Sequence, residues 1–290
     1  MSGRDVRYAE RMFELSAVLV DRIVDRALEE DLSGGDVTTE SCIDDGALAT
    51  AHAVARSAVV VCGGPVFARV FQRVDPSLRV EVAQADGARV AKGTTLWTVR
   101  GRARSILMGE RTALNLAQRM TGVATLTRTY VDAIPEGCTA RITDTRKTMP
   151  GLRLLDRYAV RAGGGHNHRD DLGSAVLIKD NHVAASGGVK EAIRRAKAYA
   201  PHTCKIECEV DTLAQLDEAI EAGADIVLLD NMDTKTVAEA VRRVKGRAYL
   251  EASGNITFAR VAELSRAGVD AISVGAVTHS APAADIGLDF

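Results

Sequence analysis

The sequence predicts an α/β protein that combines an open or incomplete parallel α/β barrel with a smaller α+β sandwich domain, formed mainly by the N-terminal segment. Residues 50–104 alternate apolar and polar positions between Gly and Asp-Gly turns, which is typical of short antiparallel strands. After residue 138, near-continuous apolar runs alternate with helical segments, as in the repeated βα units of a parallel sheet. Nearly every apolar run ends in polar residues or glycine, and a barrel assembles its site from many strand ends in this way.

The first part of the chain carries the elements expected for the sandwich domain. Helical periodicity in residues 10–30 precedes the antiparallel strands, and residues 110–120 (ERTALNLAQRM) form an amphipathic helical pattern. Arg111 lies on this helix, where the pattern alone favours a solvated surface charge. Residues 86–99 (DGARVAKGTTLWTV) are similar to the turn and strand of a lipoyl or biotinyl carrier fold, but no modifiable lysine lies at the tip of a hairpin.

The second part of the chain carries the strands expected for the barrel. The apolar runs are residues 139–143, 175–179, 205–210, 225–230, 248–252 and 270–275. Six strands are too few for a complete eight-unit barrel of roughly 250 residues, so the barrel should be open or incomplete. We expect an N-terminal domain at residues 1–112, a barrel domain at residues 113–275, and a C-terminal segment, residues 276–290, that returns toward the N-terminal domain.

The composition narrows the class of protein. The chain of 290 residues carries 37 Lys and Arg against 39 Asp and Glu, so a nucleic-acid-binding protein is not favoured. The five cysteines are scattered, and no apolar run is long enough for a signal sequence or a membrane span, which indicates a reducing cytoplasm. The neighbouring Cys204 and Cys208 lack the second ligand pair that a zinc site needs, so we expect buried thiols.

Basic side chains and histidines gather around a triple glycine in residues 141–182, in a number larger than folding requires. A packed core excludes unpaired cations, so these side chains should converge on an anion and bind it through charge-assisted hydrogen bonds. The expected anion-binding residues are Arg146, Lys147, His168, Arg169 and Lys179. The region therefore predicts an active site for a small acidic substrate.

Carboxylates lie on the later strands. Glu207 and Glu209 are two residues apart, so both point to one face of their strand and enter the barrel interior if the residues between them face the helices. Glu207 is equally compatible with a structural pairing to Lys205 or to the arginines at the strand ends. Asp230 ends the next strand, where an acidic residue is more often functional than structural.

Small residues follow the last two strands, at Ser253–Asn255 and Val274–Ala276. Each segment by itself is ordinary turn chemistry. Because small residues expose backbone N–H groups to an incoming phosphate, the two segments together predict a phosphate site.

An ordered set of motifs spans the chain: ERTALN with TGVAT, DTRKTMPGLR, YAVRAGGGHNHR, LIKDNH, IECEV, LLDNM, EASGNI and VGAVTHS. In this order they resemble the quinolinate phosphoribosyltransferase family, also called nicotinate-nucleotide pyrophosphorylase (carboxylating). The resemblance runs from ALEEDLSGGDVTTE near the amino end to DIGLDF at the carboxyl end. The sequence departs from the family pattern at Asn255, where a second glycine is common, and at Cys208, where a β-branched residue is usual.

The resemblance implies a reaction and a role for each site residue. The phosphoribosyl group of 5-phosphoribosyl 1-pyrophosphate (PRPP) would pass to the ring nitrogen of quinolinate with decarboxylation, giving nicotinate mononucleotide, pyrophosphate and CO2 in de novo NAD biosynthesis. The implied quinolinate-binding residues are Arg111, Arg146, His168, Arg169 and Lys179, with Arg111 supplied by a neighbouring subunit. The implied catalytic residues are Lys147, Glu209 and Asp230. The implied PRPP phosphate-binding residues are Ser253, Gly254, Asn255, Gly275 and Ala276.

The resemblance also implies the cofactors and partners. Mg²⁺ would be held mainly by PRPP, with Glu209 and Asp230 nearby, and no organic cofactor is needed because the glycosylated pyridinium holds the electrons left by decarboxylation. The partners would be the two small-molecule substrates and a second copy of the chain, in a homodimer with a shared active site or in a hexamer, with no nucleic acid and no membrane. The alternatives are a molybdenum-transport-associated paralogue of the same fold, nicotinate phosphoribosyltransferase, and a non-catalytic carrier or interaction module.

Overall fold

The computed structural model describes residues 15–290, which divide into two compact units. The first unit contains the residues up to Arg128 together with residues 148–164 and 277–290, and the second contains residues 129–147 and 165–276. The long helix α5 (Ala103–Asp132) runs through the position at residues 112 and 113 where we expected a domain boundary. The chain therefore passes between the units several times.

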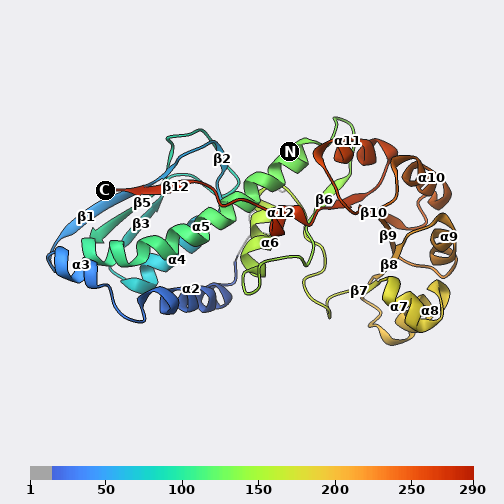
Figure 1. Ribbon diagram of the computed structural model, residues 1–290, viewed down its shortest axis with the longest axis horizontal. Coiled ribbons are helices and arrows are strands. Elements are labelled where there is room, and N and C mark those ends of the chain that lie inside the picture. The colour runs from blue at the N-terminus through green and yellow to red at the C-terminus, as the bar shows by residue number, and fades with distance from the viewer. Residues whose placement is uncertain (1–14) are drawn as a thin grey trace. The chain divides into compact units, whose positions relative to one another are not determined.

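The first unit contains a four-stranded antiparallel sheet in the order β12-β1-β5-β3 (Figure 1). Its strands are β1 (Leu48–Ala55), β3 (Arg79–Val82), β5 (Thr95–Arg102) and β12 (Ile286–Asp289), and the short β2 (Val59–Val60) and β4 (Arg89–Val90) pair with each other. Alternate residues of β1, including Ala51, Ala53 and Ala55, are fully buried. This period of two is the alternation that the sequence predicted for half-buried strands.

Helices complete the core of the first unit. They are α2 (Ala17–Leu32), α3 (Val37–Cys42), α4 (Gly64–Val74), α5 and α6 (Arg153–Ala162). Phe67 and Phe71 on α4 pack in a T-shaped pair with ring centroids 5.0 Å apart, and Trp97 of β5 lies 4.8 Å from Phe67. All three rings are fully buried, so they join α4 to the sheet through a large apolar contact.

The last residues of the chain belong to the first unit. The backbone N–H of Ala284 donates to the carbonyl of Gln118 on α5, at 2.9 Å, and the Gln118 side chain donates to the carbonyl of Ile286, at 2.7 Å. At Gly122 a Cβ atom would lie 1.9 Å from the carbonyl oxygen of Pro282, so only glycine permits this approach. The pairing of β12 with β1 then adds a C-terminal strand to the edge of the N-terminal sheet.

The second unit contains a six-stranded parallel sheet in the order β6-β11-β10-β9-β8-β7 (Figure 1). Its strands are β6 (Arg141–Thr143), β7 (Val176–Ile178), β8 (Ile206–Val210), β9 (Ile226–Asp230), β10 (Tyr249–Ser253) and β11 (Ala271–Ser273). The first strand, β6, pairs with the last, β11, as in a closing barrel, and a parallel bridge joins Thr143 to His166 beyond it. Among the described residues no strand pairing joins β7 to β6, so the predicted open or incomplete barrel is confirmed.

Helices α7 (Asp180–Ser186), α8 (Val189–Tyr199), α9 (Leu213–Glu221), α10 (Thr234–Val244) and α11 (Phe258–Ala267) follow the strands of the second unit. Figure 1 shows α8 to α11 along the outer side of the curved sheet. Side-chain oxygens of Thr212, Asp233 and Thr257 cap the first turns of α9, α10 and α11 by accepting a backbone N–H. The short helix α12 (Ala276–His279) begins at the last residue of this unit.

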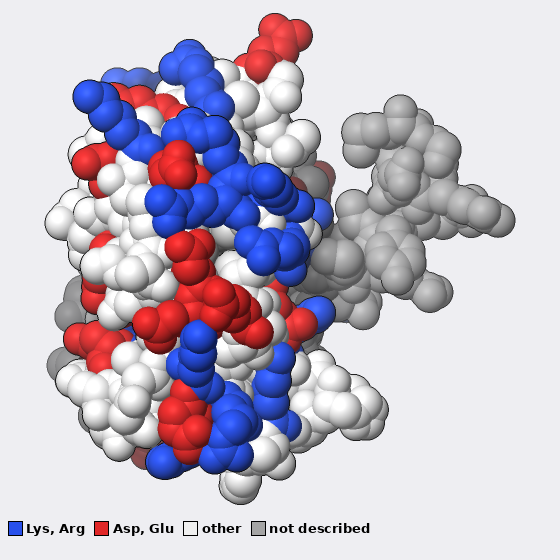
Figure 2. Space-filling view, turned by 90° about the vertical axis from the view of Figure 1, so that its right-hand side faces the viewer, with Lys and Arg blue, Asp and Glu red and all other residues white. Residues whose placement is uncertain are grey.

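The outer helices of the second unit carry charges of both signs. Glu191 accepts from Arg194 and Arg195 on α8, and Glu239 accepts from Arg242 and Arg243 on α10. Figure 2 shows basic side chains next to acidic ones on this face. No helix in residues 15–290 has the length and apolar character needed to cross a membrane.

Candidate active site

The predicted site residues of the barrel gather at the carboxyl ends of its strands. Parallel neighbouring strands end at the same edge of a sheet, so residues far apart in sequence meet there. In strand order the residues are Arg146 and Lys147 after β6, His168 and Arg169 after the His166 bridge, Lys179 after β7, Glu209 in β8, Asp230 at the end of β9, Ser253 at the end of β10, and Gly275 after β11. All of them belong to the second unit.

A buried aspartate holds the histidine-containing loop in place. Asp144, which is fully buried, accepts a hydrogen bond from the backbone N–H of His168, at 2.7 Å, and another from the Asn167 side chain, at 2.6 Å. The backbone N–H of Asp144 donates in turn to the carbonyl of His166, at 3.1 Å. The first residue of the DTRKT motif therefore fixes the GGGHNHR loop, a role that the motif by itself did not reveal.

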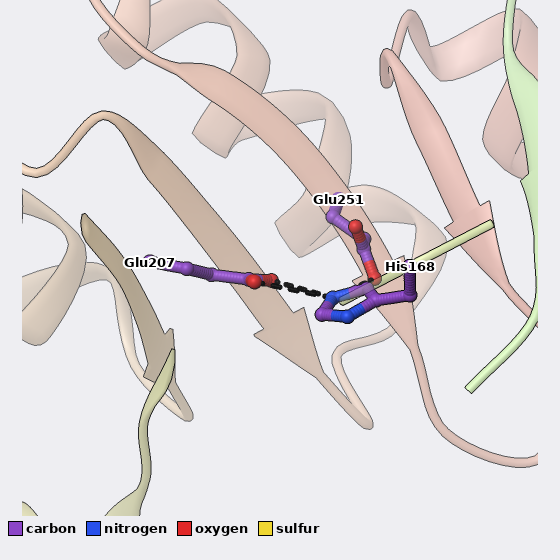
Figure 3. A group of neighbouring side chains, drawn as sticks. All are labelled: His168, Glu207 and Glu251. Atoms are coloured by element: carbon purple, nitrogen blue, oxygen red, sulfur yellow. Dashed lines mark hydrogen bonds and ion pairs between the residues drawn. The ribbon is translucent and has the colours of Figure 1, made fainter. Parts of the chain in front are cut away.

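The imidazole of His168 lies between two buried glutamates (Figure 3). Its Nε2 atom is 3.1 Å from a carboxylate oxygen of Glu207 on β8 and 3.5 Å from Oε1 of Glu251 on β10. Both glutamates are nearly inaccessible to solvent. On the other side of the ring, Nδ1 accepts the backbone N–H of Arg169, at 2.8 Å. The sequence left open a structural pairing of Glu207 with Lys205 or with an arginine at the strand ends. The structure instead places Glu207 against His168, and Lys205 pairs with Asp225 at 3.1 Å.

The packing of these three groups changes their proton affinity. Burial, and next the nearby Glu207 charge, raise the pKa of Glu251 to about 7 against the opposing effect of His168. Burial by itself lowers the pKa of His168, but the hydrogen bond to Glu207 and the charges of Glu251 and Asp144 outweigh it and raise the pKa. The Nδ1 contact with the Arg169 N–H opposes protonation of the ring. The three side chains therefore share protons as a group.

Cations lie close to one another around this cluster. Burial, and next the charge of Arg146, lower the pKa of Arg169, whose guanidinium donates to the carbonyl of Ala175 at 3.0 Å. Two arginines near enough to repel each other are stabilised when an anion lies between or beside them. Lys147 is exposed, with its backbone N–H on the Thr145 hydroxyl at 3.1 Å.

Lys179 and Glu209 form an ion pair, with 2.7 Å between Nζ and Oε2. The family resemblance assigns them to different substrates, Lys179 to quinolinate and Glu209 to PRPP. A bound substrate could replace this ion pair by interacting with either side chain, and Lys179 is half exposed. The pair therefore lies where the two expected substrate positions would adjoin.

The segment after β10 has a backbone that few residues can adopt. Gly254 has φ +95°, and a Cβ atom there would lie 2.1 Å from Oδ1 of Asn231 and 2.9 Å from its backbone nitrogen. Asn255 has φ 46° and Asn231 has φ 52°, and asparagine tolerates this left-handed region better than most residues. The Asn231 N–H donates to the carbonyl of Ser253, at 3.1 Å, and its side chain donates to Asp230, at 2.6 Å. The departure at Asn255 thus leaves the turn intact.

A second buried aspartate, in the first unit, fixes the chain just after Lys147. Asp156 is fully buried and accepts the backbone N–H of Met149, at 3.1 Å, and both ends of the Arg119 guanidinium, at 2.9 and 3.0 Å. Arg119 also donates to the carbonyl of Thr278, just after the segment of Gly275 and Ala276. The ion pair therefore holds the first-unit ends of two segments that carry predicted site residues.

Arg111 and the cysteines are the remaining residues singled out in the sequence. Arg111 lies on α5 in the first unit, with its side chain 62 % exposed and 4.0 Å from Glu110. Burial, with the charges of Glu209 and Glu207, raises the pKa of the Cys208 thiol to about 12, so this residue is not a thiolate nucleophile near neutral pH. The five cysteines are all free thiols.

The fold and site together define a class of protein: an open parallel α/β barrel whose strand ends bring basic side chains together with carboxylates and a glycine turn. Residues 36–121 match the model of the quinolinate phosphoribosyl transferase N-terminal domain, and residues 123–289 match that of the C-terminal domain. The chain belongs to the quinolinate phosphoribosyltransferase family.

Individual relatives agree with this assignment along nearly the whole chain. The nicotinate-nucleotide pyrophosphorylase (carboxylating) of Mycobacterium leprae is 45 % identical over 91 % of this chain and 95 % of its own length. A probable nicotinate-nucleotide pyrophosphorylase (carboxylating) of Bacillus subtilis is 40 % identical over 90 % of this chain and 89 % of its own. Among solved structures, the nicotinate-nucleotide pyrophosphorylase from Francisella tularensis superimposes with a TM-score of 0.91 at 37 % identity, over 95 % of this chain and 97 % of that one.

Proposed function

We propose that this protein is a nicotinate-nucleotide pyrophosphorylase (carboxylating). It transfers the phosphoribosyl group of PRPP to quinolinate and releases pyrophosphate and CO2, giving nicotinate mononucleotide for NAD biosynthesis. The observation that carries the proposal is the meeting, at one sheet edge, of the basic residues after β6 and β7 with the carboxylates of β8 and β9. A dicarboxylate and a phosphorylated sugar need these two kinds of group side by side.

Quinolinate binds through the cations of the site. Arg146, Arg169 and Lys179 neutralise its two carboxylates, and the mutual repulsion of the two arginines supports an anion at this place. His168 belongs to the same subsite, next to Arg169 in the chain. Arg111 completes the subsite from a neighbouring subunit, and its largely exposed side chain is consistent with this role.

PRPP binds at the later strand ends. Ser253, Gly254, Asn255, Gly275 and Ala276 supply small residues and backbone N–H groups to its 5-phosphate. Glu209 and Asp230 lie at the ends of neighbouring strands and accept hydrogen bonds from the ribose hydroxyls. Lys147, on an exposed loop, neutralises the pyrophosphate that leaves.

Mg²⁺ fits this site because carboxylate oxygens of Glu209 and Asp230 lie at adjacent strand ends, and hard oxygen donors suit this ion. PRPP would hold the ion mainly through its own phosphates, and Glu209 and Asp230 would lie nearby. When bound, Mg²⁺ neutralises charge on the departing pyrophosphate.

The chain contributes positioning and charge stabilisation to the reaction, and no covalent intermediate on a side chain. The quinolinate nitrogen forms a bond to C1 of the ribose while the bond from C1 to the pyrophosphate oxygen breaks, and Glu209 and Asp230 stabilise the positive charge that develops on the ribose. The C2 carboxylate then leaves as CO2, the bonding electrons stay at C2 next to the pyridinium nitrogen, and C2 takes up a proton. No organic cofactor is needed.

The minimal functional assembly is a homodimer with a shared site, which a hexamer would also contain. This follows from the role given to Arg111 of a neighbouring subunit. The free state of the five cysteines is consistent with a reducing compartment such as the cytoplasm.

Turnover of the purified protein with quinolinate, PRPP and Mg²⁺ tests the proposal, with nicotinate plus ATP as the parallel reaction. Nicotinate mononucleotide and CO2 formed from quinolinate in a magnesium-dependent way would support it. Product from nicotinate alone would instead indicate nicotinate phosphoribosyltransferase. No turnover in either reaction would favour the molybdenum-transport-associated paralogue.

A further inference from the structure

We propose that Glu207 and Glu251 are positioning residues of the quinolinate subsite, which act through the imidazole of His168. The inference rests on the function proposed above and deepens it, because it names two residues without an assigned role in that site. Both glutamates are nearly inaccessible to solvent. Both set the orientation of a ring whose neighbour, Arg169, binds the substrate.

On one side, the ring of His168 contacts two side chains of the parallel sheet. Glu207 comes from β8 and Glu251 from β10, with β9 between them, and both side chains reach the same Nε2 atom (Figure 3). Nε2 forms a hydrogen bond with Oε1 of Glu207 at 3.4 Å and lies 3.1 Å from its Oε2, whereas the buried Oε1 of Glu251 has no hydrogen-bond partner and faces the ring at 3.5 Å. Two acceptors around one donor restrict rotation of the ring about its bond to Cβ.

On its other side, the same ring forms a hydrogen bond with the loop that carries Arg169. Nδ1 accepts the backbone N–H of Arg169, and Asp144 accepts the backbone N–H of His168. The loop that carries Arg169 is therefore held at two successive amides, one by a buried aspartate and one by a ring that buried glutamates orient. Binding side chains are commonly held in place by buried residues that do not contact the ligand themselves. A displacement of the binding side chain by about 1 Å is enough to lose much of its interaction with the ligand.

A resident metal ion is a weaker explanation of the cluster. The ring and the two carboxylates have atoms within 4.8 Å of one another, as a metal site would. However, Nε2 already forms a direct hydrogen bond with Oε1 of Glu207, and the remaining ring nitrogen accepts the backbone N–H of Arg169. The charged neighbours of the ring are Glu207, Glu251 and Asp144, with Arg169 next in the chain.

The test compares two substitutions at one position, Glu207→Ala and Glu207→Gln. The glutamine keeps an oxygen acceptor for Nε2–H and loses the charge, whereas the alanine removes both and leaves the ring unsupported. We expect Glu207→Ala to raise the KM for quinolinate at least about tenfold, because a hydrogen bond to a charged group is worth at least that factor. Glu207→Gln should recover part of this loss, and the KM for PRPP should change less than about twofold in both variants.

A measurement without substrate accompanies the kinetics. The nitrogen chemical shifts of the His168 ring report its tautomer and hydrogen bonds, with the signal assigned from a His168→Gln variant. We expect Glu207→Ala to shift both ring nitrogens and Glu251→Gln to shift Nε2. Asp75→Asn is the matched control, because Asp75 is a buried carboxylate of the first unit, bound by Ser77, Ser105 and Arg102, and its loss should move neither the ring signals nor the KM for quinolinate.

Five outcomes decide between the hypotheses. Shifted ring signals with a selective rise in the KM for quinolinate would support the proposal. Equal rises in both KM values, or shifted ring signals with an unchanged KM for quinolinate, would overturn it, since the glutamates would then only stabilise the fold. A wild-type protein without quinolinate turnover would contradict the proposed function itself, and an active wild type with an unaffected Glu207→Ala variant would contradict this inference alone.

Discussion

Replacement of Glu251 by glutamine should remove a pH dependence of stability that this residue brings to the second unit. Glu251 is nearly inaccessible, with its pKa raised from 4.5 to about 7, mainly by burial and next by the charge of Glu207. Glutamine has the shape of the protonated side chain and does not titrate. The variant therefore isolates the contribution of the charge.

The sign follows from proton binding in the two states. The folded protein keeps the proton of Glu251 up to about pH 7, whereas the unfolded chain releases it near pH 4.5. The folded state binds more protons between these values, so the free energy of unfolding falls as the pH rises through this window. The raised pKa of His168 acts in the same direction, because its proton also stabilises the folded state and is lost at higher pH.

The magnitude follows from the change in pKa. At about 1.4 kcal/mol per pKa unit, the ionisation of Glu251 costs roughly 3 kcal/mol of stability at pH 8.5 and less than about 1 kcal/mol at pH 5. The stability advantage of Glu251→Gln over the wild type should therefore grow by roughly 2 to 3 kcal/mol between pH 5 and pH 8.5. Urea denaturation followed by circular dichroism, at fixed protein concentration and several pH values between 5 and 8.5, measures the difference.

The dependence of the unfolding free energy on pH also provides the control, Asp75→Asn, and the result that would refute the prediction. Asp75, whose pKa is lowered by its hydrogen bonds to Ser77, stays ionised in both states over this pH range, so Asp75→Asn should lose the same stability at every pH. If the difference between Glu251→Gln and the wild type did not change between pH 5 and 8.5, the carboxyl would not titrate in this window and the reasoning would be wrong.

Three further predictions concern the substrates. Arg146→Ala should abolish quinolinate turnover and leave PRPP binding detectable by calorimetry, because it removes a cation specific for one substrate; loss of both would place Arg146 in the other subsite. Gly254→Ala should raise the KM for PRPP about tenfold or more with little effect on quinolinate binding, because its Cβ would meet Asn231 in a left-handed turn, and an unchanged KM would count against the phosphate site. Mixing Arg111→Ala chains with Lys179→Ala chains should restore part of the activity, since a mixed dimer rebuilds one intact site, and no recovery would exclude a role for Arg111 across subunits.

Much of the barrel could be predicted from the sequence because its signals are local. Six apolar runs with polar ends predicted a parallel sheet and the sheet edge at which the site is expected. The number of six short strands predicted an open barrel. The motif order added the family and the residues expected to bind charged substrates. A strand such as residues 205–210 shows its alternation in neighbouring positions, so the inward direction of Glu207 could be expected from the spacing of the two glutamates alone.

The partners of these residues could not be predicted, since pairing across a sheet depends on register and curvature. Lys205 lies closer in sequence to Glu207 than His168 does. However, Lys205 precedes β8 and pairs with Asp225, which precedes β9, so this pair lies at the amino ends of the strands, away from the site. Glu251 lies in an ordinary apolar run with no sign that its carboxyl is buried. Asp144 directly follows a strand, and nothing in its sequence context indicates that it holds the loop of His168.

The sequence by itself therefore determined the α/β class, the family and the set of charged residues at the strand ends, because periodicity and ordered motifs are written along the chain. Only the tertiary structure decided that Glu207 and Glu251 enclose the ring of His168, that Asp144 holds its loop, and that Asn255 and Gly254 adopt left-handed backbone. The physical reason is that a buried charge acquires its partner and its proton affinity from neighbours that are distant in sequence, and folding alone brings those neighbours within a few ångströms.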